Sequence, residues 1–269
     1  MILSGRAGID LSVGAVVSLS GIVFGFAYGV WGWPLFLAIL LAVLVGAACG
    51  AVNGVLIAYI DFPPIIATLA SFYALKSIAI LVSNQSPINT QPIQDFYSAA
   101  QSVEIPLIGR FLPLVPLGLL TFLVPVAVLV WALLNRTTFG RVLYAAGTND
   151  EAARWAALPN RLYRALSYAL SGGISALAGV FVVAQFASAR PDAGVSGNGM
   201  ALPAITIAVL GGVAITGGIG RVAGVLLATL VVVWLNAGIL LLVPGNAGSQ
   251  MQLLALGVLL LGRRCSTPR

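Results

Sequence analysis

The most restrictive feature of this sequence is a run of fifty residues, 11–60, without a single Asp, Glu, Lys, Arg or His. Five further uncharged stretches follow, at 77–94, 111–135, 165–189, 193–220 and 222–262. A water-soluble globule has too little interior to bury so much apolar chain, whereas a bilayer requires roughly 20 consecutive apolar residues for each spanning helix. The sequence therefore predicts an all-α, polytopic transmembrane helical bundle.

The apolar runs also predict how the bundle is divided. Cutting them at Pro, Gly and charged residues gives about eight spans. We expect these spans near 12–29, 35–59, 64–83, 113–134, 163–187, 200–215, 222–243 and 250–262. The segments 200–215 and 250–262 are short enough to be re-entrant instead. With 60% hydrophobic and 7% charged residues, the chain leaves no room for a soluble domain, so 1–269 is predicted to be one transmembrane domain.

Arginine predicts the orientation of the bundle. The net charge of +6 comes almost wholly from arginines at the ends of apolar runs, as the positive-inside rule explains, so we expect no nucleic-acid partner. Arg110 and Arg190 fall on one side of the predicted topology. The other side collects Arg6, Arg136, Arg141, Arg154, Arg161, Arg164, Arg221, Arg263, Arg264 and Arg269. Both termini and the 135–162 loop are therefore predicted to be cytoplasmic, and the 84–112 loop faces outward.

The residue inventory argues against catalysis. There is no histidine, the two cysteines lie far apart, and Lys76 is the only lysine, which rules against a metal site or a catalytic triad. The glycine-rich segment 211–224 has no Gly-Lys-Ser/Thr sequence, so the chain cannot supply a phosphate loop for ATP hydrolysis. We therefore expect no enzymatic activity, no metal and no cofactor.

Small residues mark two helix faces. Gly21, Gly25 and Gly29 recur every four residues, and so do Gly46, Gly50 and Gly54. In lipid, such faces let helix backbones approach closely, which predicts tight packing within the bundle. Participation in a substrate path is the alternative.

One soluble segment has the signature of a short capped helix. Thr148 and Glu151 form a predicted capping box, with Thr148 as the N-cap, and the helix ends before Leu158-Pro159. The segment either docks onto a cytoplasmic partner or only connects two spans. Its candidate partner-contacting residues are Thr148, Asn149, Asp150, Glu151, Ala152, Ala153 and Arg154.

Two glycine-interrupted segments, 8–14 and 211–224, each lead into a long apolar helix. Paired broken segments in two halves of a membrane protein are typical of a transport site or a mobile joint. Asp10 is either a functional acid at the membrane boundary or the N-cap of the following helix. The candidate pathway or hinge residues are Asp10, Ser12, Asn53, Thr68, Gly211, Gly212, Gly217, Gly218 and Asn236.

Seven segments follow one another along nearly the whole chain in a family-specific order: 8–14, 53–54, 63–69, 138–154, 188–194, 204–212 and 217–220. Together they resemble the membrane permease subunits of bacterial ABC importers for monosaccharides, of the ribose type. The segment 200–206 is similar to the branch that serves the autoinducer-2 signal. The resemblance implies a multi-pass protein of the bacterial inner membrane, whose 148–157 segment docks on an ATPase subunit.

The resemblance also implies the partners: a cytoplasmic ATP-binding dimer, a second permease copy or a paralogue, an extracytoplasmic sugar-binding protein and membrane lipid. Two departures stand out. Trp155-Ala-Ala-Leu158 replaces the family's usual Ser-Gly-Ile-like ending of the coupling segment. Members also usually carry about one further span before the segment at 8–14, so we expect the given start to lack N-terminal span(s).

The leading interpretation is thus the permease subunit of an ATP-driven sugar importer. It would form the translocation pathway for a small neutral, polyol-like solute and couple to a separate ATPase subunit. The alternative is a secondary transporter or channel for a small neutral solute. Ion-coupled carriers tend to have ionisable residues inside their spans. Here Lys76 is the only ionisable residue that clearly lies inside a predicted span. A membrane scaffold or enzyme is a third, weaker interpretation.

Overall fold

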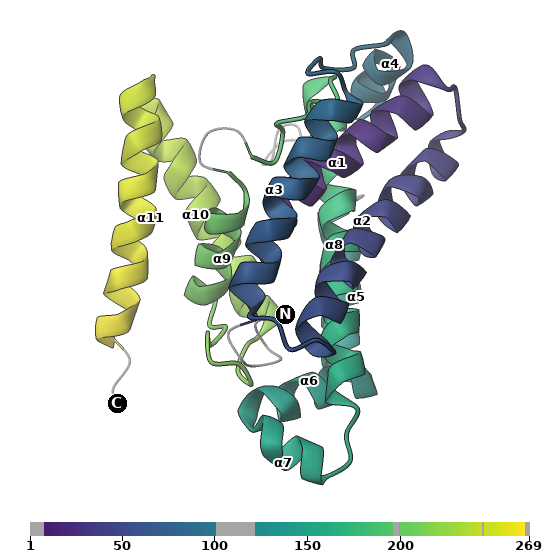
Figure 1. Ribbon diagram of the computed structural model, residues 1–269. Coiled ribbons are helices and arrows are strands. Elements are labelled where there is room, and N and C mark those ends of the chain that lie inside the picture. The colour runs from purple at the N-terminus through teal and green to yellow at the C-terminus, as the bar shows by residue number, and fades with distance from the viewer. Residues whose placement is uncertain (1–7, 101–121, 196–198, 244, 267–269) are drawn as a thin grey trace, which may run out of the picture.

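The computed structural model describes residues 8–100, 122–195, 199–243 and 245–266. Its named elements are all helices, and no strand occurs in these ranges (Figure 1). They are α1 (Val13–Phe24), the π-helix η2 (Gly25–Val30), α2 (Leu35–Ala58), α3 (Pro64–Val82), α4 (Gln91–Ala99), α5 (Val124–Arg136), α6 (Thr138–Thr148), α7 (Asp150–Trp155), α8 (Asn160–Phe186), α9 (Ala201–Leu210), α10 (Val222–Leu242) and α11 (Asn246–Ser266). The predicted polytopic helical bundle is confirmed.

Among the described residues, five helices are long and apolar enough to cross a membrane: α1 with η2, α2, α3, α8 and α10. A sixth span results if α5 and α6, which meet at 69°, form one broken span. The predicted span at 200–215 contains α9 alone, which is only 10 residues long. The predicted span at 113–134 lies partly outside the described residues, so the expected number of eight stays a prediction.

Proline sets the starts of α2 and α3. Pro34 and Pro63 occupy the N-cap positions, and Pro64 is the first residue of α3, where its missing N–H costs no intrahelical hydrogen bond. Both boundaries fall where the sequence predicts them. The observed ends of α2, α8 and α10 also lie within three residues of the predicted ones.

Among the described helices, α2 and α8 make the most extensive contact. A Cβ atom added at Gly46 would lie 2.6 Å from both the Ala176 Cβ and the Gly172 carbonyl oxygen. At Gly50 the obstacle would be the Tyr168 carbonyl oxygen, and at Gly54 it would be the Ala165 carbonyl oxygen, at 2.6 Å. The predicted close packing along this glycine face is therefore confirmed.

The glycine face of α1 and η2 is packed as well. Gly21 lies against Gly179 of α8, while Cβ atoms added at Gly25 and Gly29 would lie 2.5 Å from Ala189 Cβ and Thr90 Oγ1. Helix α1 is surrounded by α2, α3 and α8, and most of its residues are buried. It forms the centre of the first half of the bundle.

The end of the molecule opposite α7 is tied by a short backbone bridge. Ile88 and Ala189 pair as an isolated antiparallel bridge, with N–H to carbonyl distances of 2.9 and 3.1 Å. Helix α4, inside the predicted outward loop 84–112, lies over this end and buries Ile93. The rest of that loop, 101–112, lies outside the described residues.

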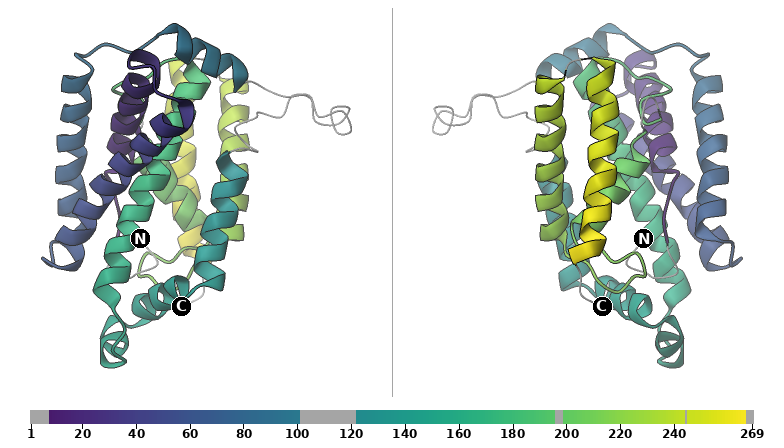
Figure 2. Two further views of the ribbon diagram at one scale, coloured as in Figure 1. Left: turned by 90° about the vertical axis from the view of Figure 1, so that its right-hand side faces the viewer. Right: turned by 90° about the vertical axis from the view of Figure 1, so that its left-hand side faces the viewer.

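Helices α9, α10 and α11 form a second group. They contact one another more extensively than they contact the first group, which is built around α1, α2, α3 and α8. Figure 2 shows α3 at one edge of the molecule and α10 at the opposite edge. Helices α6 and α7 project below both groups (Figure 1). This arrangement places the 135–162 segment at one end of the bundle, away from α4.

Candidate functional site

The predicted cytoplasmic loop 135–162 is mostly helical. Helix α5 ends at Arg136, and α6 then runs to Thr148, with Val142, Leu143 and Ala146 buried. Helix α7 follows after a single residue and spans Asp150–Trp155. The sequence predicted one short helix here, and the structure has two.

The expected capping box at Thr148 is wrong by one residue. Asn149 is the N-cap of α7, and its Oδ1 accepts the Ala152 N–H at 3.0 Å. Thr148 is the last residue of α6, and its hydroxyl donates to the Tyr144 carbonyl oxygen at 2.9 Å. Thr148 is the last residue of α6, so the next residue, Asn149, starts α7; asparagine is a better N-cap residue than threonine.

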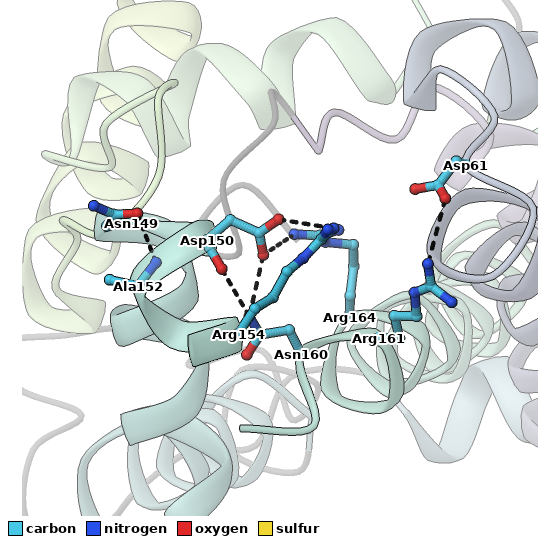
Figure 3. Close-up of polar contacts among 8 residues, drawn as sticks. All are labelled: Asp61, Asn149, Asp150, Ala152, Arg154, Asn160, Arg161 and Arg164. Atoms are coloured by element: carbon cyan, nitrogen blue, oxygen red, sulfur yellow. Dashed lines mark hydrogen bonds and ion pairs between the residues drawn. The ribbon is translucent and has the colours of Figure 1, made fainter. Parts of the chain in front are cut away.

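Asp150 fixes α7 to α8 (Figure 3). Its Oδ1 accepts from Arg164 Nη2 at 3.1 Å and from Asn160 Nδ2 at 3.2 Å. Its Oδ2 lies 3.3 Å from Arg154 Nη2, one turn along α7. The Arg164 side chain is only 5% exposed, so this carboxylate joins a surface helix to a buried cation. The group Asp150–Arg164–Asn160 is called the α7 clamp below.

A second ion pair lies beside the clamp. Arg161 Nη2 at the start of α8 is 3.6 Å from Asp61 Oδ2 in the turn between α2 and α3 (Figure 3). Both side chains are about half exposed, so the pair contributes little stability on its own. The pair joins the α2–α3 turn to the start of α8, close to the α7 clamp.

The free face of α7 is exposed. Glu151 and Arg154 are open to solvent, and Trp155 is 85% exposed. Together with Asp150 they line an open hollow of about 540 Å³. A tryptophan left uncovered on a short polar helix is typical of a surface that a partner protein covers. Of the seven candidate residues here, only Ala153 is buried.

Three of the predicted pathway or hinge residues, Asp10, Ser12 and Asn53, are joined in one buried hydrogen-bonded network, and Thr68 lies beside it. Asp10 Oδ1 accepts from the Ser12 hydroxyl at 2.6 Å, and Asn53 Nδ2 donates to Ser12 Oγ at 3.0 Å. Asn53 Oδ1 accepts from Ser71. Thr68 donates to the Pro64 carbonyl oxygen at 2.8 Å and reaches the Ile9 carbonyl oxygen at 3.5 Å. The network joins the start of α1 to α2 and α3.

Asp10 is not the N-cap of α1, since Ser12 occupies that position. The Asp10 carboxylate nevertheless accepts the Ser12 backbone N–H at 2.8 Å, which holds the entry to the helix. Burial raises the pKa of Asp10 above its ordinary value, and the hydrogen bonds from Ser12 act in the opposite direction. The role of this network as a pathway or a hinge stays a prediction.

The other five candidates lie in the second half of the bundle. Gly211 packs against Gly224 and Val225 at the start of α10, and Gly218 lies against Thr148. Gly212 and Gly217 have positive φ angles of 100° and 96°. Asn236 is on α10, and its carbonyl oxygen accepts from Gln252 of α11 at 2.9 Å. These residues do not join the Asp10 network, so the nine candidates form no single site.

A family model matches residues 1–262, and its description is branched-chain amino acid transport system / permease component. The chain belongs to this permease family. Similar relatives are the autoinducer 2 import system permease proteins LsrD of Klebsiella pneumoniae, Yersinia enterocolitica and Enterobacter sp., at 36%, 37% and 35% identity. The alignments cover 100% of this chain and 78%, 78% and 80% of those proteins. No solved structure matches the chain.

Family membership and the apolar helices agree on the function at the level of the subunit. The permease is a multi-pass inner-membrane protein and the transmembrane subunit of an ATP-driven importer. It forms the substrate pathway and couples to a separate ATPase subunit. Among the described residues, no group of three or more His, Cys, Asp or Glu side chains could hold a metal ion.

Some residues of the permease that matter here were not singled out from the sequence. Asn160 and Arg164 complete the α7 clamp, and Ser71 completes the Asn53 network. Ser71 follows Thr68 by three residues, so helical spacing places both on one face of α3. Arg164 falls just inside a predicted span, and an arginine there indicates a buried partner.

We predict that Asn53→Ala lowers the thermal stability of the permease more than a substitution at an exposed position of the same helix. Asn53 is fully buried, and its loss leaves the Ser12 and Ser71 hydroxyls with fewer partners, at a cost of roughly 1–3 kcal/mol. Thermal unfolding in detergent and uptake measure the effect, with the exposed Val52→Ala as the control. A normal melting temperature with lost uptake would instead favour a direct role in the pathway.

Proposed function

We propose that this permease works as one of a pair, with a second copy or a paralogue, above an ATPase dimer and below an extracytoplasmic binding protein. The observation that carries the proposal is α7, a short helix clamped to α8 through Asp150 while Glu151 and Trp155 stay uncovered. A helix held this firmly transmits a push at its free face into the bundle. The chain itself hydrolyses no ATP, because it has no phosphate loop.

The substrate we propose is a small uncharged sugar of the furanose type, such as autoinducer-2. The relatives named for autoinducer 2 import align over the full chain, which supports this class. The polar side chains near the start of α1 are those of Asp10, Ser12, Asn53, Thr68 and Ser71. Apart from the Asp10 carboxylate they are hydroxyls and an amide, which suit a hydroxyl-bearing solute.

Uptake by cells that carry only this importer tests the substrate. The permease is expressed with its ATPase and binding-protein partners in a strain without related importers. We expect ATP-dependent uptake of autoinducer-2 that exceeds uptake of leucine. Leucine transport without sugar transport would contradict the proposal and would favour the amino-acid function named in the family description.

Docking through α7 is tested by Glu151→Lys and Trp155→Ala. Both residues are exposed, so the changes should leave the bundle folded while removing a charge or an apolar contact from the interface. We expect co-purification with the ATPase subunit to fall about tenfold, as for loss of a central interface contact. Arg154→Glu is less clean, because Arg154 also pairs with Asp150.

Asp95→Lys on α4 is the matched control, since it reverses an exposed acid at the opposite end of the molecule. Its co-purification should stay normal. If both α7 variants also purify normally with the ATPase subunit and transport normally, α7 is only a connector.

We propose that α7 and both termini are cytoplasmic and that α4 is outside, as the arginine distribution predicts. A membrane-impermeant thiol reagent applied to intact cells should label a cysteine at Gln91. It should not label Cys265 or a cysteine at Ala156 until the cells are opened. Labelling of Cys265 from outside would reverse the orientation.

A further inference from the structure

A loop rich in glycine connects α9 to α10 and is folded on itself. In this segment, 211–221, the Gly217 N–H donates to the Ala214 carbonyl oxygen at 3.0 Å. The Ala214 N–H in turn donates to the Ile219 carbonyl oxygen at 2.9 Å. Gly217 and Gly218 have φ angles of 96° and 74°, which glycine adopts without strain. We call 211–221 the glycine loop.

The glycine loop touches the end of α6. Tyr144 Oη donates to the Gly220 carbonyl oxygen at 2.7 Å. A Cβ atom added at Gly218 would lie 2.6 Å from Thr148 Oγ1 and 2.8 Å from the Thr148 backbone nitrogen. No side chain therefore fits at Gly218 unless the loop or α6 moves. Thr148 directly precedes Asn149, the N-cap of α7.

Helix α7 is thus held from two sides. The α7 clamp ties Asp150 to α8, which packs on α1 and α2. The glycine loop ties Thr148, two residues earlier, to the group of α9, α10 and α11. Figure 1 shows this loop below α9 and α10, at the level of α6. The α6–α7 corner is therefore a point where the two helix groups meet.

We propose that the glycine loop is a positioning element of the transport cycle. It passes a displacement of α7 to α9 and α10, as the clamp passes it to α8, so that both helix groups respond to the ATPase subunit. Tyr144 and Gly218 are the positioning residues. This inference rests on the proposed function, in which α7 receives the push.

The test uses Tyr144→Phe and Gly218→Ala in the assembled importer, reconstituted in liposomes with its ATPase and binding-protein partners. The first variant removes only the hydroxyl that reaches Gly220, and the second places a methyl group against Thr148. Gly238→Ala on α10 is the control, because a Cβ atom there meets nothing within 4 Å.

We expect both variants to assemble normally with the ATPase subunit, since the exposed face of α7 is untouched. Substrate transported per ATP hydrolysed should fall about threefold in Tyr144→Phe, the worth of one hydrogen bond. It should fall about tenfold in Gly218→Ala, where a positive φ and a close contact both oppose the methyl group. The control should keep the wild-type ratio.

The outcomes separate this inference from the function on which it rests. A wild-type permease that neither binds the ATPase subunit nor transports contradicts the proposed function. If the wild type is coupled and both variants keep its ratio, the glycine loop is not a positioning element. Hydrolysis and transport that fall together, at an unchanged ratio, would show a structural role only and would also overturn the inference.

Discussion

Replacing Asp150 with Ala is expected to abolish uptake while leaving the permease in the membrane. Arg164, which is only 5% exposed, loses the carboxylate that lies 3.1 Å away, and Asn160 loses an acceptor. Removing one partner of a buried ion pair costs about 3 kcal/mol. We expect this loss to detach α7, a helix of six residues, from α8. Helix α7 could then still bind the ATPase subunit, but its movement would no longer be transmitted to α8.

The measurements are uptake, membrane content and ATPase activity in the assembled importer. Asp192→Ala is the control, because Asp192 pairs with Arg190 at 3.6 Å and both side chains are about half exposed. Such surface pairs contribute little. Normal uptake in Asp150→Ala would mean that α7 is positioned without the clamp.

The second large effect is expected at the α2–α8 contact. Gly50→Val places a branched side chain against the Tyr168 backbone, so the two helices must move apart at this contact. Overpacking of this kind costs roughly 3 kcal/mol, and in lipid close packing is the main source of helix association. We expect the variant to aggregate or to be degraded.

Gly173→Ala is a control at the same interface. A Cβ atom there lies 3.7 Å from Val43 Cγ1 and 3.8 Å from Ala47 Cβ, which is ordinary contact. Size-exclusion profiles in detergent compare the two variants. A monodisperse, active Gly50→Val permease would contradict the assigned role of the glycine face.

The sequence predicted the long helices well because their boundaries depend on residues that are close together in the sequence. Proline starts α2 and α3, and cutting the apolar runs at Pro, Gly and charged residues predicts the ends of α2, α8 and α10 to within three residues, although α8 begins at Asn160 and includes Arg161 and Arg164. Helix α6 was missed, because its 11 residues are too few for a span and the preceding uncharged run ends at Arg136.

The parts of the site that could not be predicted depend on contacts between distant residues. Asn53 and Ser71 are 18 residues apart, and Tyr144 meets Gly220 across 76 residues. The choice of Asn149 over Thr148 as N-cap depends on where α6 ends, which one-dimensional spacing does not reveal. The glycine faces were predicted, but which helix covers each face was not.

The α2–α8 contact also has a consequence for biosynthesis. Gly172 is encoded 122 residues after Gly50, so at about 5–20 residues per second α2 waits roughly 6–24 seconds for its main partner. Until then α8 is not available to cover its glycine face. The buried amide of Asn53, however, finds Ser12 and Ser71 within the first 71 residues. The nascent chain can therefore pair this buried amide with α1 and α3 long before α8 leaves the ribosome.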